Sequence, residues 1–177
     1  MSATFLAGCG TTAGPIPTDP PATPEGTPPA EITPVPADGS LANACPSLEQ
    51  AKAAVPALVS GPDVNTEPFK TMVLQCGYGT NELDVQGRQA GIGILVFDAS
   101  AEGVHLWDSS RTDPGFPNPT DVPDLAEVAF VTGMPGHYDL WVVQGKYGFH
   151  MSHLVQSGIP LDQMVALGRA MVAGLGR

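Results

Sequence analysis

Prolines divide this chain into two parts that cannot fold alike. Nine of its 19 prolines fall between Pro15 and Pro36. Residues 10–40 have too few apolar side chains to offset the entropy of ordering them, so we expect a disordered or polyproline-like Pro/Thr-rich tether there. Removing the first 40 of 177 residues leaves 137. Residues 41–177 are therefore enough for one domain, which would bury about two-thirds of its unfolded surface.

The charge balance excludes one large class of partners. The chain carries 18 acidic and 7 basic residues, a formal net charge of −11, and the basic residues form no cluster in the sequence. A nucleic-acid-binding protein needs a basic face to neutralise phosphates, so neither DNA nor RNA is an expected partner. No apolar run approaches the roughly 20 residues of a membrane-spanning helix. The acidic surface is interpreted as a source of solubility.

A short apolar patch precedes the tether. Leu6-Ala7-Gly8-Cys9 resembles the lipobox of bacterial lipoproteins, in which the signal peptide is cut before the cysteine and the thiol is acylated, typically with palmitate. The resemblance implies a signal remnant at residues 1–9, a lipid anchor at Cys9 and an extracytoplasmic domain on the cell membrane. A secretory signal needs a basic start and roughly 7–15 apolar residues. Two interpretations stay open: the signal begins upstream of Met1, or Cys9 is an ordinary cysteine.

Two cysteines remain once Cys9 is assigned to the lipid. In an exported domain, Cys45 and Cys76 are expected to form a disulfide. Closing a loop of about 30 residues should stabilise the domain by about 3–4 kcal/mol. The alternative is two free buried thiols. No Cys-x-x-Cys or histidine-rich spacing indicates a zinc site, and no cofactor is expected.

Three helices are expected in the domain. Ser47 and Gln50 form a capping box for the first, which Pro56 ends. Ser100 can cap a second helix, and Pro160 suits the first position of the third. The expected core-facing positions are Leu48, Ala51 and Val55, then Val104 and Trp107, then Leu161, Met164, Val165, Leu167, Met171, Val172 and Leu175.

Alternating apolar residues predict five strands. Gly61-Pro62 is interpreted as a turn, residues 81–90 as a polar turn, Gly145-Lys146 as a hairpin turn and residues 111–124 as a long surface loop. We predict an α+β fold, a mostly antiparallel sheet of about five strands with three helices packed on it, in the order α-β-β-α-β-β-β-α. Cys76 points to the more apolar side of the first strand, so the disulfide would join the first helix to the sheet. The strands are expected at residues 69–78, 92–97, 127–131, 138–144 and 147–154.

These elements together resemble a known family. The resemblance rests on four features: Cys45 just before a short helix, Cys76 in the first strand, the run 124–130 (Asp-Leu-Ala-Glu-Val-Ala-Phe) before a hairpin, and the terminal helix. They resemble small actinobacterial lipoproteins of unknown function, which are similar in turn to extracellular sensor domains of mycobacterial serine/threonine kinases. The resemblance covers residues 41–177. It implies an envelope-exposed domain with a ligand cleft, and it transfers no catalytic residues.

No catalytic motif is evident. There is neither a Gly-x-Ser-x-Gly nucleophile elbow nor a Walker-type loop. Gly91-Ile92-Gly93 begins a Gly-x-Gly pattern but continues into a strand, so these glycines are interpreted as places where backbone or ligand approaches closely, or as part of a twisted strand.

The histidines give weak signals. His150 and His153 are three apart in an expected strand and should point to opposite faces, so they should not share a metal ion. His137 and Asp139 could assist Ser109 or Ser152 in a hydrolase, although a solvated loop histidine is the ordinary interpretation.

Five aromatic residues are a candidate ligand cleft between the last hairpin and the second helix. Their ordinary role in a domain of this size is to fill the core. An apolar wall with a few polar groups is nevertheless typical of small-molecule sites. The five are Trp107, Tyr138, Trp141, Tyr147 and Phe149.

The function expected from the sequence is that of a cell-envelope lipoprotein with a non-catalytic ligand-binding or sensory domain. One alternative is a protein-interaction subunit that recruits a membrane partner through the loop 111–124. Another is a hydrolase with a site around His137, Asp139 and His150. The tether and the missing catalytic motif favour the first hypothesis.

Overall fold

The computed structural model describes residues 41–67, 71–99, 107, 109–115, 119–134, 137–155 and 158–175. The expected lipobox and tether lie outside the described residues. So do Phe69, at the expected start of the first strand, and Ser100 and Val104 of the expected second helix. Trp107 and residues 109–112 are helical.

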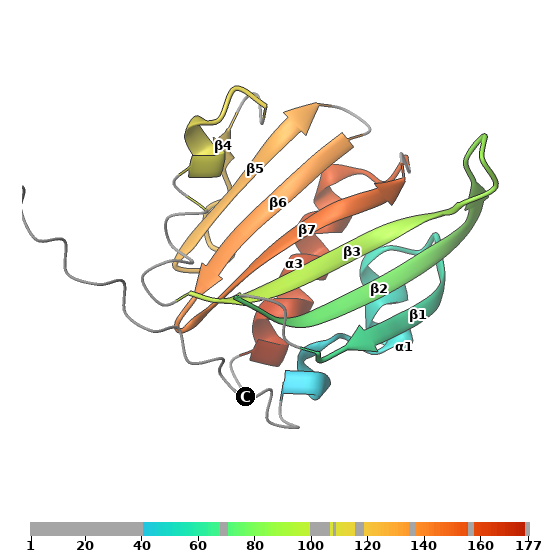
Figure 1. Cartoon of the computed structure of the whole chain (residues 1–177), viewed down its shortest axis with the longest axis horizontal. Helices are drawn as coiled ribbons and strands as arrows, with labels where there is room; N and C mark the ends of the chain where they lie inside the picture. Colours follow the sequence, from blue (N-terminus) through green and yellow to red (C-terminus); the bar gives the residue numbers. More distant parts are fainter. Residues whose placement is uncertain are drawn as a thin grey trace, which may run out of the picture. The chain divides into compact units, whose positions relative to one another are not determined.

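The described part of the chain has an α+β fold. Its strands are β1 (Leu58–Asn65), β2 (Met72–Leu83), β3 (Gln89–Asp98), β4 (Thr120–Asp121), β5 (Val128–Met134), β6 (His137–Gln144) and β7 (Tyr147–Val155); its helices are the 3-10 turn η1 (Leu41–Ala44), α1 (Leu48–Ala54) and α3 (Leu161–Leu175). All seven strands belong to one sheet in the order β1-β2-β3-β7-β6-β5-β4, and every neighbouring pair is antiparallel (Figure 1). The predicted α+β class and antiparallel sheet are confirmed, with seven strands rather than five.

Local signals place both α-helices where the sequence predicts them. At the start of α1 the Ser47 hydroxyl accepts a hydrogen bond from the Gln50 backbone N–H (3.3 Å), and the Gln50 side chain accepts one from the Ser47 N–H (2.9 Å). This capping box satisfies two of the backbone donors that a helix start leaves open. Helix α3 begins directly after Pro160, whose missing N–H costs nothing at that position.

The turn predicted at Gly61-Pro62 is wrong, because these residues lie inside strand β1. Strand β1 is at the edge of the sheet, where a proline removes no hydrogen bond to a further strand. The register between β1 and β2 shifts on both sides of Ser60, which accommodates the irregular backbone. The other missed strand, β4, pairs Thr120 and Asp121 with β5 inside the predicted loop 111–124.

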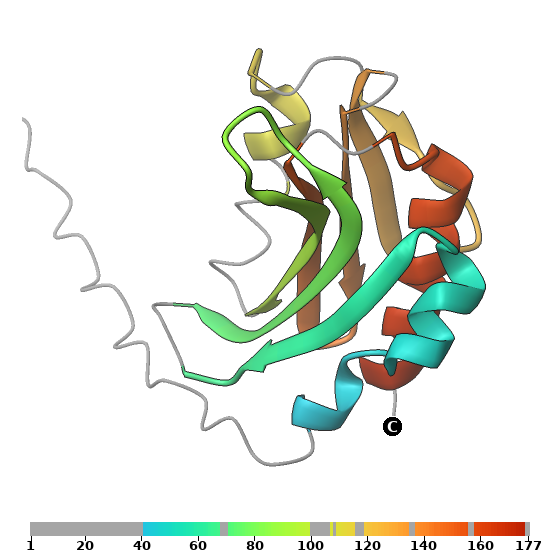
Figure 2. The ribbon, with the colours of Figure 1, turned by 90° about the vertical axis from the view of Figure 1, so that its right-hand side faces the viewer.

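One face of the sheet carries the hydrophobic core, and we call it the helix face because α1 and α3 cover it (Figure 2). Gly168 lets α3 approach the sheet, since a β-carbon there would lie 2.8 Å from the Leu140 side chain. The fully buried side chains on this face include Leu74, Cys76, Tyr78, Ile92, Ile94, Leu140, Phe149 and Met151 from the strands and Met164, Leu167 and Met171 from α3.

The segment before α1 is tied to strand β2 twice. Cys45 and Cys76 form the expected disulfide, with Cα atoms 5.8 Å apart. Two residues further along β2, the Tyr78 hydroxyl donates a 2.6 Å hydrogen bond to the Pro46 carbonyl. Burial raises the pKa of Tyr78 well above its ordinary value. Both links join the start of the first helix to the sheet, as the sequence predicts for the cysteines.

Candidate functional site

The opposite side of the sheet, which we call the open face, is built from the residues that alternate with the core positions. Because Cys76 and Tyr78 point to the helix face, their neighbours Gln75, Gly77 and Gly79 lie on the open face. Strand pairing extends one row of the open face from Gly77 through Gly93 and Ser152 to Asp139. At about 4.8 Å per strand, this row is about 14 Å long.

Glycines form the floor of the open face on β2 and β3. Gly77 pairs with Gly93, and Gly79 pairs with Gly91. A β-carbon on Gly91 would lie 2.0 Å from the Tyr78 carbonyl oxygen, so the backbone itself approaches closely there, as the sequence suggested for this Gly-x-Gly pattern. A β-carbon on Gly77 would meet nothing nearer than 3.6 Å. A side chain at this position would therefore make only ordinary van der Waals contacts through its β-carbon.

A groove of about 370 Å³ lies over this floor. Its volume falls within the roughly 300–1,000 Å³ typical of small-ligand sites. Asp63 is the charged residue of the lining, and the Gln89 side-chain amide is held by a 2.7 Å hydrogen bond to the Thr80 carbonyl. The lining residues are Ser60, Gly61, Pro62 and Asp63 of β1, Gly77, Tyr78 and Gly79 of β2, Gln89 of β3 and Leu154 of β7.

Beyond the glycine floor the open face holds a sheltered polar pair. His150 Nε2 lies 2.8 Å from Asp139 Oδ1, and their side chains are 17% and 11% exposed. The imidazole stacks on the Trp141 indole, with ring centroids 3.9 Å apart and planes 15° apart. Trp141 in turn donates a 3.2 Å hydrogen bond from its indole nitrogen to Thr132 Oγ1. The orientation of the imidazole is thus fixed from two sides.

The hydrolase hypothesis named three residues, and the structure brings two of them together. His150 and Asp139 are paired, whereas exposed His137 lies with its ring 6.0 Å from that of His153. His153 points to the helix face and lies 3.0 Å from Met164 Sδ, so the prediction that His150 and His153 face opposite ways is confirmed.

Such a His–Asp pair is what orients a general base in acyl-transfer enzymes. Ser152 lies beside Asp139 on the neighbouring strand, but the described contacts include no hydrogen bond between its hydroxyl and His150. The nucleophile-to-base contact of a hydrolase is therefore missing from the described residues.

The five aromatic residues proposed as one cleft do not line one. Trp107 and Trp141 belong to a small cluster on the open face, whereas Tyr138, Tyr147 and Phe149 pack in the core of the helix face. Trp107 fits there because Gly148 leaves it room: a β-carbon on Gly148 would lie 2.6 Å from the indole. All five side chains thus belong to a hydrophobic cluster or pack against one, and the two clusters lie on opposite faces of the sheet.

The groove residues were missed by sequence reasoning. The usable signal was the pair of Gly-x-Gly patterns at Gly77-Tyr78-Gly79 and Gly91-Ile92-Gly93, which the antiparallel register places side by side. In the described part of the chain, no three His, Cys, Asp or Glu side chains are close enough to hold a metal ion. None of the described helices has the length and apolarity needed to span a bilayer.

The Cys45–Cys76 disulfide is compatible with an extracytoplasmic location, since such bonds persist in oxidising compartments. No family model, no curated protein and no solved structure matches the chain.

Proposed function

We propose that this protein is a cell-envelope lipoprotein, anchored through Cys9, whose domain binds a ligand in the groove of the open face without transforming it. The groove itself is the observation that carries the proposal, because it is a hollow of ligand-binding size on the face opposite α1 and α3, and the helical residues 107 and 109–112 do not line it. A tether and a lipid would hold such a domain at the membrane with the groove accessible to envelope molecules.

The chemistry of the groove favours a neutral or positively charged ligand. The lining contains Asp63 and no basic side chain, and its other polar groups are the Ser60 hydroxyl and the Gln89 amide. A phosphate or carboxylate ligand would meet Asp63 with like charge and without a compensating cation. Hydroxyl groups and ammonium groups both suit a carboxylate, a hydroxyl and an amide.

A thermal-shift survey of the full chain tests the proposal. Neutral glycans, cationic peptides and zwitterionic lipids would be compared, and a ligand at 100 times its Kd should stabilise the fold by about 2.7 kcal/mol. Gly77→Val should abolish that shift, because the new side chain enters the groove while its β-carbon makes only ordinary contacts. Ala53→Val is the control, since Ala53 is exposed on α1 and lies outside this groove. Absence of any ligand, or equal binding by Gly77→Val, would refute the groove as the site.

The paired His150 and Asp139 support a hydrolase as a second candidate. A fluorophosphonate probe separates the two functions: labelling of Ser152 that is lost in His150→Gln would establish an activated serine. The binding proposal expects no labelling, because the described contacts give Ser152 no base.

A further inference from the structure

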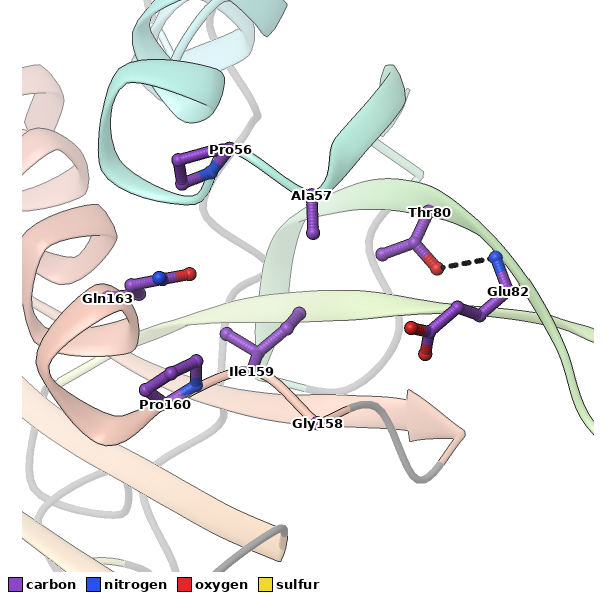
Figure 3. Close-up of a pocket in the computed structure, with 8 residues that line it drawn as sticks. All are labelled: Pro56, Ala57, Thr80, Glu82, Gly158, Ile159, Pro160 and Gln163. Carbon is purple, nitrogen blue, oxygen red and sulfur yellow. Dashed lines mark hydrogen bonds between the residues drawn. The ribbon is translucent and has the colours of Figure 1, made fainter.

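A second cavity lies on the other side of β2, at the end of the helix face. It has a volume of about 290 Å³, just below the roughly 300–1,000 Å³ typical of ligand pockets. Figure 3 shows it between the α1–β1 connection, the end of β2 and the start of α3. Pro56, Ala57, Ile159 and Pro160 make its apolar wall.

Three polar side chains line this cavity, and one of them, that of Thr80, already makes hydrogen bonds within the protein. The Thr80 hydroxyl donates to the Ala90 carbonyl and accepts from the Glu82 N–H, both at 3.1 Å. Glu82 and Gln163 are the other two, and the described contacts include no hydrogen bond or ion pair of either side chain. In Figure 3 the Glu82 carboxylate and the Gln163 amide face the cavity from β2 and from α3.

We infer that this cavity binds a primary ammonium group on a short alkyl chain, such as a lysine side chain of a partner peptide or a free alkylamine. The methylenes would pack on Pro56, Ile159 and Pro160, and the ammonium group would meet the Glu82 carboxylate. The exposed Glu82 carboxylate would repel an anion, and a purely apolar ligand would gain nothing from it.

Amide NMR of the full chain, titrated with N-acetyl-lysine-N-methylamide, tests this inference. The lysine probe should shift the amide signals of Ala57, Glu82 and Gly158, and the uncharged N-acetyl-norleucine-N-methylamide should need about fivefold higher concentration to do so. Glu82→Gln keeps the shape of the side chain and should weaken binding about fivefold, the upper value for an exposed ion pair. Glu49→Gln is the matched control, because Glu49 is an exposed carboxylate on α1 outside the cavity.

Equal binding by Glu82→Gln, equal binding of the norleucine probe, or no shift at these three amides would overturn the inference. Gly158→Val should block the cavity, whereas Gly77→Val, on the open face, should leave lysine binding unchanged. A negative result for the cavity is thus distinguishable from a negative result for ligand binding in the groove of the open face. A parallel titration with pentylamine identifies the source: binding as tight as that of the lysine probe indicates a free amine, and weaker binding indicates a peptide side chain.

Discussion

The two faces of the same sheet are built for different tasks. On the helix face, successive strands present large side chains such as Leu74, Ile94 and Met151, each at most 1% exposed and packed in one cluster with residues of α3. On the open face, the alternating positions of the same strands are Gly77, Gly93 and a serine. The first face therefore supplies stability, while the second leaves room at Gly77; above Gly93 the Leu154 side chain fills the space.

The open face is itself divided. Toward β5 and β6, Trp107 lies against the Phe97 and Trp141 rings, with centroids 5.7 and 6.0 Å away. Its indole nitrogen donates to the Val142 carbonyl at 3.1 Å, so this part is closed by side chains. Toward β1 and β2 the groove remains. The contrast locates binding at the β1–β2 end of the open face.

The largest predicted effect is a cavity mutation on the helix face. Phe149→Ala should lower the free energy of unfolding by about 3–5 kcal/mol, because Phe149 is fully buried in the main cluster. Urea denaturation of the purified chain measures it. Ser152→Ala, on the open face of the same strand, should change stability by less than about 0.5 kcal/mol. Equal effects of the two substitutions on the free energy of unfolding would contradict the claim that the helix face supplies the stability.

Removing the disulfide should have the next largest effect. The Cys45→Ala/Cys76→Ala double variant should lose about 3–4 kcal/mol, since the unfolded chain regains the freedom of a loop of about 30 residues. Denaturation with and without dithiothreitol checks this: reductant should destabilise the wild type to the same degree and leave the double variant unchanged. A wild-type protein insensitive to reductant would contradict the expectation.

Tyr78→Phe should cost about 1 kcal/mol at neutral pH, the value of one buried hydrogen bond, here to the Pro46 carbonyl. Burial raises the pKa of Tyr78 in the folded state, so above pH about 10 the unfolded chain releases this proton while the folded chain keeps it. Stability should therefore fall as the pH rises through that region. Denaturation measured between pH 8 and 11 should show this loss of stability in the control Tyr138→Phe, and the loss should be absent in Tyr78→Phe. The same loss of stability in both variants would contradict the assignment to Tyr78.

Signals contained in a few neighbouring residues were predicted well from the sequence. The capping box at Ser47, the hairpin turn at Gly145-Lys146 and the helix after Pro160 all depend on local chemistry. Strand β1 was missed because Gly61-Pro62 is a local turn signal, and pairing with β2, distant in sequence, overrides it at a sheet edge.

The candidate site was harder to predict, because it depends on which face the helices cover. Period-two alternation was enough to separate Tyr138 from Trp141, which are three residues apart in one strand and so face opposite ways. Alternation alone does not predict the groove, because Asp63 and Gly77 are brought together by the register between β1 and β2. That register includes a shift that no local pattern in the sequence indicates.

The most direct test of the difference between the faces places the same substitution on each. Gly77→Val on the open face should leave the free energy of unfolding within about 0.5 kcal/mol of the wild type, because the added β-carbon makes only ordinary contacts. Gly168→Val on α3 should lower it by about 1–3 kcal/mol, because its β-carbon would lie 2.8 Å from the side chain of fully buried Leu140 and 3.6 Å from that of Leu125. Urea denaturation of the pair gives the answer. A loss at Gly77 equal to or larger than that at Gly168 would contradict the claim that the open face has room for a ligand.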